Sequence, residues 1–68
     1  MLYIDMIQNS INYIEENLKT ELKAEELAGN AGFSLFHYYR VFQGAVGLPI
    51  MQYVVRRKLI HAINEISI

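Results

Sequence analysis

Two short helical patterns, over residues 24–31 and 34–46, are separated by a turn of only a few residues, and this constrains the fold more than any other feature. Gly32 ends the first pattern, because glycine adopts at little steric cost the left-handed conformation that closes a helix. Ser34 suits the start of the second, because its hydroxyl can accept a hydrogen bond from a free backbone amide. Two helices joined by so short a turn cross at a wide angle.

The side chains around this turn have the sizes and spacings that such a crossing needs. Ala28 is a small residue where the two helices would touch, and Phe33 and Tyr38 flank Ser34 as a hydrophobic staple. Lys23 stands at the first N-cap position and is a poor cap, because it has no acceptor for the free amides. Five apolar residues fall where they would fill the angle between the helices: Leu27, Ala31, Phe33, Tyr38 and Val41. The pattern predicts a helix-turn-helix, and the alternative is an ordinary helical hairpin capped by glycine.

The rest of the chain is also helical in pattern. Apolar residues recur at spacings of three and four over roughly 3–18, which predicts an amphipathic helix there. Gly47-Leu48-Pro49 ends the third helix, and Pro49 fits the first turn of a fourth helix, so that this helix spans about 49–66. No strand-like alternation bounded by turns is present. The sequence therefore predicts one small all-α domain with four helices in a homeodomain-like arrangement.

The net charge of -1 is divided unevenly along the chain. Residues 1–26 hold six acids and two lysines, whereas residues 27–68 hold three arginines and one lysine against Glu65 alone. One end of the molecule can therefore carry a positive field although the whole chain is slightly acidic. Chance segregation in a short helical domain is the alternative, so charge alone does not decide the class of partner.

The helix predicted over 34–46 has two faces of different chemistry. The core face follows the spacing i, i+3, i+4 and i+7 and consists of Tyr38, Val41, Phe42 and Ala45. The opposite face, with Leu35 near it, carries two aromatics, an arginine and an amide: Phe36, Tyr39, Arg40 and Gln43. Exposed aromatic side chains cost solubility and therefore indicate a contact surface. The alternative is that Phe36 or Tyr39 folds back onto the core.

The chemistry of this opposite face matches a DNA major groove. Arg40 can bridge O6 and N7 of a guanine or bind a phosphate, and Gln43 can pair with an adenine or bind a phosphate. Phe36 can pack on a thymine methyl group, and Tyr39 can do the same or donate its hydroxyl to a phosphate. The amino end of the helix, with the Ser34 hydroxyl and free amides, can hold a backbone phosphate.

The apolar side of the fourth predicted helix changes part-way along its length. Its first stripe consists of Ile50, Tyr53 and Val54, and its second, on roughly the opposite side, consists of Val55, Leu59, Ala62, Ile63 and Ile66. Such a change suits a helix that bridges two cores, and the alternative is a frayed tail. Without a second core the later stripe is exposed, so we expect self-association through residues 55–66. Arg56 and Lys58 can add phosphate affinity, although a basic triplet is usually a solvated face.

From about Ile7 to Ile66 the sequence resembles the AraC/XylS transcription regulators. The resemblance rests on residues 13–18, 22–28, 31–34, 38–42, 47–49 and 53–59, and on Ala62. In that family a long linker helix joins two helix-turn-helix subdomains, which insert recognition helices into successive major grooves of double-stranded DNA. The resemblance implies that residues 1–68 are the first subdomain plus the linker helix, with the second subdomain and any effector domain absent. Lys23 departs from the family, which usually has Ser or Thr there.

The resemblance also assigns roles to individual residues. Phe36, Tyr39 and Arg40 occupy positions from which family members commonly reach bases. Ser34 and His37 lie where contacts to the DNA backbone are expected. Arg57 is expected to brace the fourth helix against the first subdomain.

Several classes of function are disfavoured by what the sequence contains. There are no cysteines, and two histidines 24 residues apart make no recognisable metal-ligand set, so we expect no metal site. No serine has a nucleophile-elbow context and no glycine-rich phosphate loop is present, so we expect neither catalysis nor a cofactor. We find no signal peptide in residues 1–5 and no apolar run that could span a membrane, and the expected compartment is the cytoplasm.

A helical interaction or dimerisation module without independent DNA binding is the competing interpretation. Slight acidity, small size and exposed apolar stripes all fit it. The two hypotheses differ in what substitutions should do: alanine at Arg40 should abolish DNA binding and leave the oligomeric state unchanged. Alanine at Leu59 and Ile63 should do the reverse.

Overall fold

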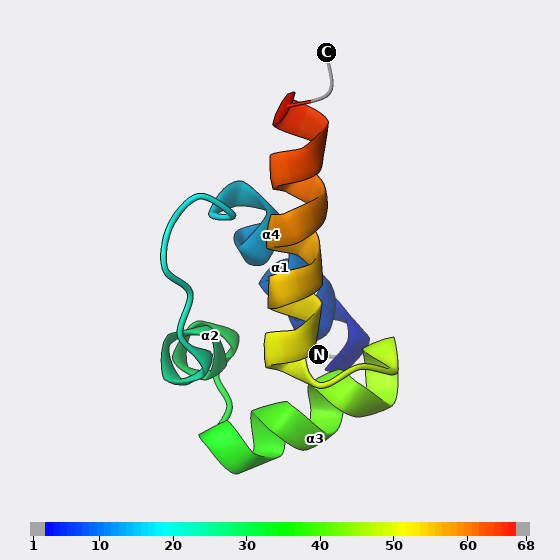
Figure 1. Ribbon diagram of the computed structural model, residues 1–68. Coiled ribbons are helices and arrows are strands. Elements are labelled where there is room, and N and C mark those ends of the chain that lie inside the picture. The colour runs from blue at the N-terminus through cyan, green and yellow to red at the C-terminus, as the bar shows by residue number, and fades with distance from the viewer. Residues whose placement is uncertain (1–2, 67–68) are drawn as a thin grey trace.

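A computed structural model describes residues 3–66; Met1, Leu2, Ser67 and Ile68 lie outside the described residues. The described part of the chain forms helices α1 (Tyr3–Glu16), α2 (Ala24–Ala31), α3 (Leu35–Val46) and α4 (Ile50–Ile66). α2 and α3 cross at a wide angle at one end of α1, and α4 rises from the end of α3 (Figure 1). The all-α prediction and the helix-turn-helix arrangement are confirmed.

The turn between α2 and α3 is built as the sequence predicts. Gly32 has φ 81°, and the amide of Phe33 donates to the carbonyl of Ala28 at 3.0 Å, which closes α2 with a left-handed cap. Ser34 caps α3, and its Oγ accepts a hydrogen bond from the amide of His37 at 3.3 Å. The rings of Phe33 and Tyr38 have centroids 6.3 Å apart, as expected for the staple. Lys23 makes no side-chain cap bond to α2.

One apolar core holds the four helices together. It draws on α1, on the loop that follows α1, and on the other three helices, and consists of Ile7, Ile14, Leu18, Leu22, Leu27, Ala28, Tyr38, Phe42, Ile50 and Val54. Tyr38, Phe42 and Ile14 are fully buried. The core therefore fixes the inner face of α3 and the first turns of α4 most firmly.

The bounds of two helices differ slightly from the approximate predicted ones. α1 ends at Glu16 rather than near residue 18, because the side-chain amide of Asn17 donates to the carbonyl of Tyr13 at 2.8 Å and the chain then turns. α4 begins at Ile50, and Pro49 lies just before its first turn.

One local prediction is wrong: Ala45 was expected in the core and is exposed. Towards the end of α3 the covering element becomes the start of α4, where the rings of Phe42 and Tyr53 lie 5.5 Å apart. At this end of α3 the side that faces the core therefore carries Phe42 and Val46, and Val46 packs against the core in place of Ala45.

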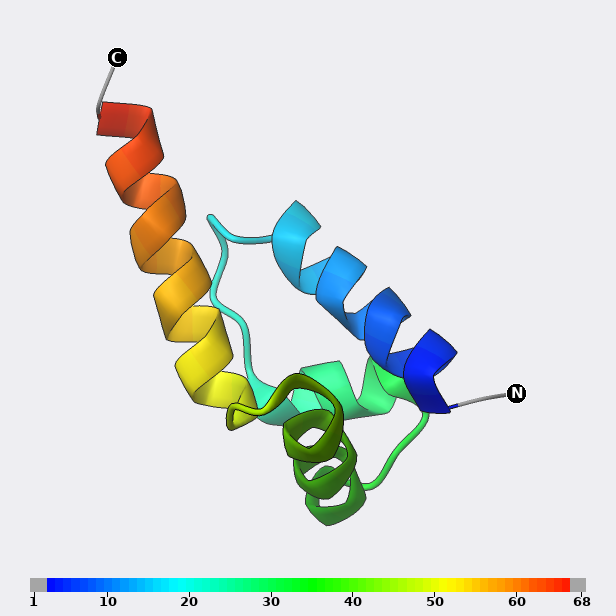
Figure 2. The same ribbon diagram turned by 90° about the vertical axis from the view of Figure 1, so that its right-hand side faces the viewer.

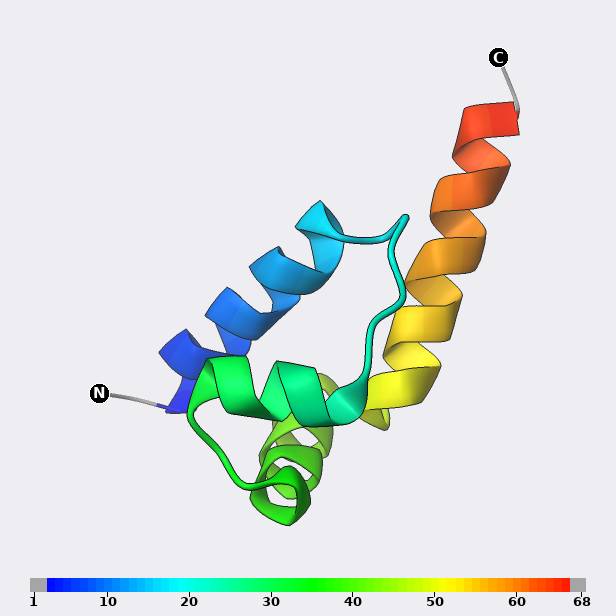
Figure 3. The same cartoon turned by 90° about the vertical axis from the view of Figure 1, so that its left-hand side faces the viewer.

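α4 has two halves with different surroundings. Ile50 and Val54 are each only 1% exposed, so the first half belongs to the core. The second half extends past the end of α1 and away from α2 and α3 (Figures 2 and 3). The apolar stripe of the second half points outwards, as the change of side predicted.

Candidate nucleic-acid interface

The outer face of α3 is exposed because its inner face is anchored in the core. Tyr38 and Phe42 are 0% exposed, whereas Phe36 is 71% exposed and Tyr39 is 41% exposed. The alternative in which either exposed ring folds back onto the core is therefore wrong. Hereafter the outer face of α3 means Phe36, Tyr39, Arg40, Gln43 and Gly44, all of them exposed.

Arg40 and Phe36 lie together near the middle of this face. The guanidinium carbon of Arg40 lies 5.8 Å from the centre of the Phe36 ring, a cation–π arrangement one helical turn apart. At an exposed site such a pair contributes only about 0.5–1 kcal/mol. The larger consequence of the pair is geometric, because it holds the Arg40 guanidinium, with its five N–H donors, beside the apolar ring of Phe36. Both side chains line a shallow hollow together with His37 and Val41.

The amino end of α3 adds a second kind of chemistry. No acid lies in the first turn of α3, so the positive end of its helix dipole is not neutralised within the helix. Ser34 satisfies the amide of His37, and its carbonyl accepts from the amide of Tyr38 at 2.8 Å. An anion near this end would meet a serine hydroxyl, backbone amides and a favourable dipole.

His37 belongs to an aromatic cluster that sequence reasoning missed. Its ring lies 4.9 Å from that of Phe33 and 5.5 Å from that of Tyr3, the first residue of α1, in edge-on arrangements. Tyr3 and Phe33 also contact each other, with centroids 5.6 Å apart. The cluster holds His37 beside the turn at the amino end of α3. Nothing in the local sequence pattern links Tyr3 to a position 34 residues further along.

The remaining predicted site residues are placed less centrally. Leu35 is half-buried and packs against the core, so it lies at the edge of the outer face. Gln43 is exposed, one turn beyond Tyr39. Gly44 also lies on this face, one turn beyond Arg40, and was not singled out from the sequence. A Cβ atom there would meet nothing within 4 Å, so the fold itself does not require glycine at this position.

The chain is similar to several curated bacterial regulators. It is 36% identical over 62 residues to an uncharacterized HTH-type transcriptional regulator, YbfP, of Bacillus subtilis, a match that covers 91% of this chain and 21% of YbfP. It is 33% identical to the HTH-type transcriptional activator AarP of Providencia stuartii, covering 91% of this chain and 46% of AarP. The multiple antibiotic resistance protein MarA of Escherichia coli is 32% identical over 53 residues, which are 78% of this chain and 42% of MarA.

These matches settle the family. The chain belongs to the AraC/XylS family. It spans less than half the length of each of these three relatives. No family model and no solved structure matches the chain.

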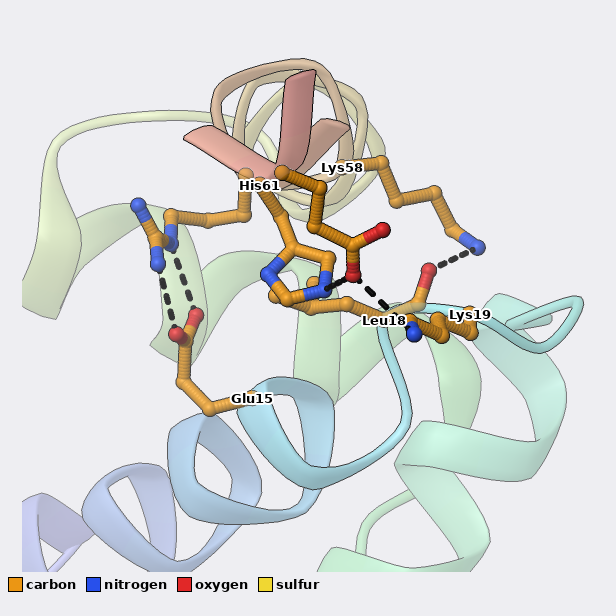
Figure 4. A network of polar contacts seen from close by, with 7 residues as sticks. Glu15, Leu18, Lys19, Lys58 and His61 are labelled. Carbon is orange, nitrogen blue, oxygen red and sulfur yellow. Dashed lines mark hydrogen bonds and ion pairs between the residues drawn. The ribbon is translucent and has the colours of Figure 1, made fainter. Parts of the chain in front are cut away.

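Within this AraC/XylS chain, a bidentate ion pair fastens α4 to α1. Arg57 donates from Nε and Nη2 to the two carboxylate oxygens of Glu15, at 2.8 and 2.7 Å. Figure 4 shows this pair beside the end of α1. The Arg57 hydrogen bond holds the pKa of Glu15 below its usual range. The bracing role expected of Arg57 from the AraC/XylS resemblance is confirmed.

A second group of contacts holds α4 against the end of α1 and the turn after it. Nζ of Lys58 donates to the carbonyl of Leu18 at 3.0 Å and also to that of Thr20. Glu65 accepts from Lys19 at 3.0 Å and from His61 at 2.8 Å (Figure 4). Lys58 is therefore engaged within the protein, and only Arg56 of the two proposed phosphate contacts is exposed.

The outer face of α4 is apolar along its whole length. Its large exposed side chains are Met51, Val55, Leu59, Ile60, Ile63 and Ile66, with exposed fractions from 37% to 82%. Met51 and Val55 line a shallow hollow together with Gln52 and Arg56. This face therefore differs from the outer face of α3, which combines rings with a cation and an amide.

Residues 3–66 contain no group of three or more His, Cys, Asp or Glu side chains that could hold a metal ion. Among the helices of these residues, none has the length and hydropathy of a membrane span.

Proposed function

We propose that this chain binds double-stranded DNA sequence-specifically as part of a transcription regulator, with α3 in the major groove. The observation that carries the proposal is the exposure of Phe36, Tyr39 and Arg40 on a helix whose opposite side is anchored by the fully buried Tyr38 and Phe42. The names of the relatives, which describe regulators and an activator of transcription, support it. The expected compartment is the cytoplasm.

Each side chain of the outer face has a chemical role in this proposal. Arg40, steadied by the Phe36 ring, reads O6 and N7 of a guanine, and Phe36 itself packs on a neighbouring thymine methyl group. Gln43 pairs with an adenine, and Tyr39 contacts a methyl group or a phosphate. Leu35, half-buried, adds only a contact at the edge.

The amino end of α3 fixes the register of the helix on the duplex. Ser34, the free amides and the ring of His37 meet a backbone phosphate there. Contacts of this kind position a protein without reading sequence. Because one helix-turn-helix makes few phosphate contacts, its affinity should be modest and should fall steeply with salt.

A second candidate function follows from the outer face of α4. Its exposed aliphatic side chains favour a protein contact, which would be made by a second helix-turn-helix subdomain or by self-association through residues 55–66. If this were the sole function, the chain would be an interaction module on a helix-turn-helix scaffold.

Fluorescence anisotropy with a mixed pool of labelled duplexes at low salt tests the proposal. We expect salt-dependent binding that Arg40→Ala weakens by about tenfold, the contribution of one good base contact. Arg56→Ala removes the same charge from α4 and is the matched control, with a smaller loss of affinity. Absence of binding to any duplex by the folded wild type would leave the interaction module as the better account.

A further inference from the structure

A buried polar contact joins the middle of α1 to the inner face of α3. Ser10 is 6% exposed and Tyr38 is 0% exposed, and Oγ of Ser10 is hydrogen-bonded to the phenolic oxygen of Tyr38. The two residues are 28 positions apart in the sequence. Among the described residues, Ser10 is the one polar residue that is buried, and it does not belong to the apolar core.

This contact constrains α3 in a way that its apolar neighbours do not. The close-packed core anchors α3, but the hydrophobic effect that drives this packing is itself not directional. A hydrogen bond is directional, and a buried hydroxyl that loses its partner is costly. Only a narrow range of positions of α3 relative to α1 keeps both hydroxyls paired.

The position of Tyr38 in α3 carries this constraint to the outer face. Tyr38 directly precedes Tyr39, and Phe36 and Arg40 lie two residues to either side of it. A rotation of α3 that breaks the bond therefore displaces all three proposed base contacts together. We infer that Ser10 and Tyr38 are positioning residues, which fix the orientation of α3 and so the sequence discrimination of the protein; this inference rests on the proposed function.

The surroundings of the pair allow a conservative replacement. The Tyr38 hydroxyl is protonated at neutral pH, as that of any tyrosine is, and burial raises its pKa further. Beside Ser10 lies a small hollow between α1 and α2, lined by Asn9, Tyr13, Leu27, Asn30 and Ala31. Threonine at position 10 keeps the hydroxyl, and Ser10 itself lines this hollow.

The test compares variants of the full chain that separate orientation from stability. Ser10→Ala combined with Tyr38→Phe removes both partners, so no hydroxyl is left unpaired and the fold should persist. Ser10→Thr should keep the contact. Ile14→Val weakens packing of the same helix without touching the pair, and serves as the control for lost stability.

Duplexes selected from a random library by the wild type provide the DNA probe, and scrambled duplexes provide the reference. We expect the double variant to lose about tenfold in the ratio of selected to scrambled affinity, with affinity for scrambled duplexes unchanged. Ser10→Thr and Ile14→Val should keep the wild-type ratio. Retention of the ratio by the double variant, or an equal loss in Ile14→Val, would overturn the inference.

A second readout needs no DNA. Relaxation dispersion of backbone amides should show new microsecond-to-millisecond exchange in α3 of the double variant and none in Ile14→Val. A rigid α3 in the double variant would overturn the positioning role. If the wild type selects no duplex, the proposed function fails, and the dispersion measurement still decides whether the pair orders α3.

Discussion

The outer faces of α3 and α4 are both exposed and both carry large apolar side chains, but their chemistry differs. Phe36 and Tyr39 on α3 are aromatic and lie beside Arg40 and Gln43. The outer face of α4 carries aliphatic side chains and a methionine, with Arg56 at its border. The edges of DNA bases offer hydrogen-bonding groups next to methyl groups. An apolar protein surface offers only apolar contacts. Exposure of apolar side chains therefore identifies two contact surfaces. The types of side chain on each surface indicate which class of partner it fits.

The inner faces differ as well. α3 is anchored by rings that are completely buried, whereas the second half of α4 is held by Arg57, Lys58 and the Glu65 contacts on the protein surface. Surface ion pairs contribute little and are screened by salt. The attachment of α3 should therefore be independent of salt and pH, and that of α4 should depend on both.

Matched charge reversals on the two helices should give the largest difference. Arg40→Glu should lower affinity for selected duplexes by about 100-fold, because it removes a base contact and adds repulsion from phosphate. Arg56→Glu makes the same change of charge on α4 and should cost about tenfold or less. Anisotropy titrations at one salt concentration measure both. Equal losses would mean that α4 also lies against DNA.

Removal of aliphatic side chains from α4 should affect association and not DNA binding. Leu59→Ala combined with Ile63→Ala should weaken self-association by about 30-fold, because each side chain would bury apolar area in both copies. Light scattering over a wide range of protein concentrations measures the change. Phe36→Ala, which removes an exposed ring from α3, is the control. A wild type that stays monomeric at high concentration would remove self-association from the account.

Gly44 lies on the outer face of α3, whereas the outer face of α4 carries no glycine. Substitution of this glycine should have a smaller effect than the changes above. Gly44→Ala and Gly29→Ala should each raise the free energy of unfolding by about 0.5–1 kcal/mol, because both are helical positions with open space around the new methyl group. Urea denaturation measures this gain. Gly44→Ala should also weaken DNA binding, whereas Gly29→Ala should not. Unchanged binding by Gly44→Ala would indicate that this part of α3 does not approach the groove closely.

The smallest expected effect concerns the ionic attachment of α4. The pKa of Glu15 is lowered in the folded state by Arg57, so the pair stabilises the fold above the ordinary glutamate pKa and this contribution is lost as pH falls through the lowered value. The pair is partly solvent-exposed, so its contribution should be a few tenths of a kcal/mol. Glu15→Gln should therefore lose less stability than the wild type between pH 7 and pH 3 in urea denaturation. An identical loss would show that the pair does not stabilise the fold.

The features that the sequence predicted correctly depend on residues close together in the chain. Gly32, Ser34 and the Phe33–Tyr38 staple follow from local backbone chemistry, and the exposure of Phe36 and Arg40 follows from helical spacing. The prediction that Ala45 is buried was wrong, because the spacing within one helix does not show where the element that covers the helix changes.

The features that were missed depend on how separate helices meet. The Ser10–Tyr38 bond, the Tyr3–His37 contact and the carbonyl partners of Lys58 each join residues more than 25 positions apart. Each requires the relative position of two helices, which local pattern does not contain. Gly44 was missed for a different reason, since its meaning depends on knowing that the space around it is open.

The most direct test of the account is a titration of the 15N-labelled protein with a selected duplex, followed by amide chemical shifts. We predict that the largest shifts fall in residues 34–44, with small shifts along residues 55–66. Largest shifts on α4, or on α1 and α2 with α3 unaffected, would contradict the assignment of α3 as the DNA-reading helix.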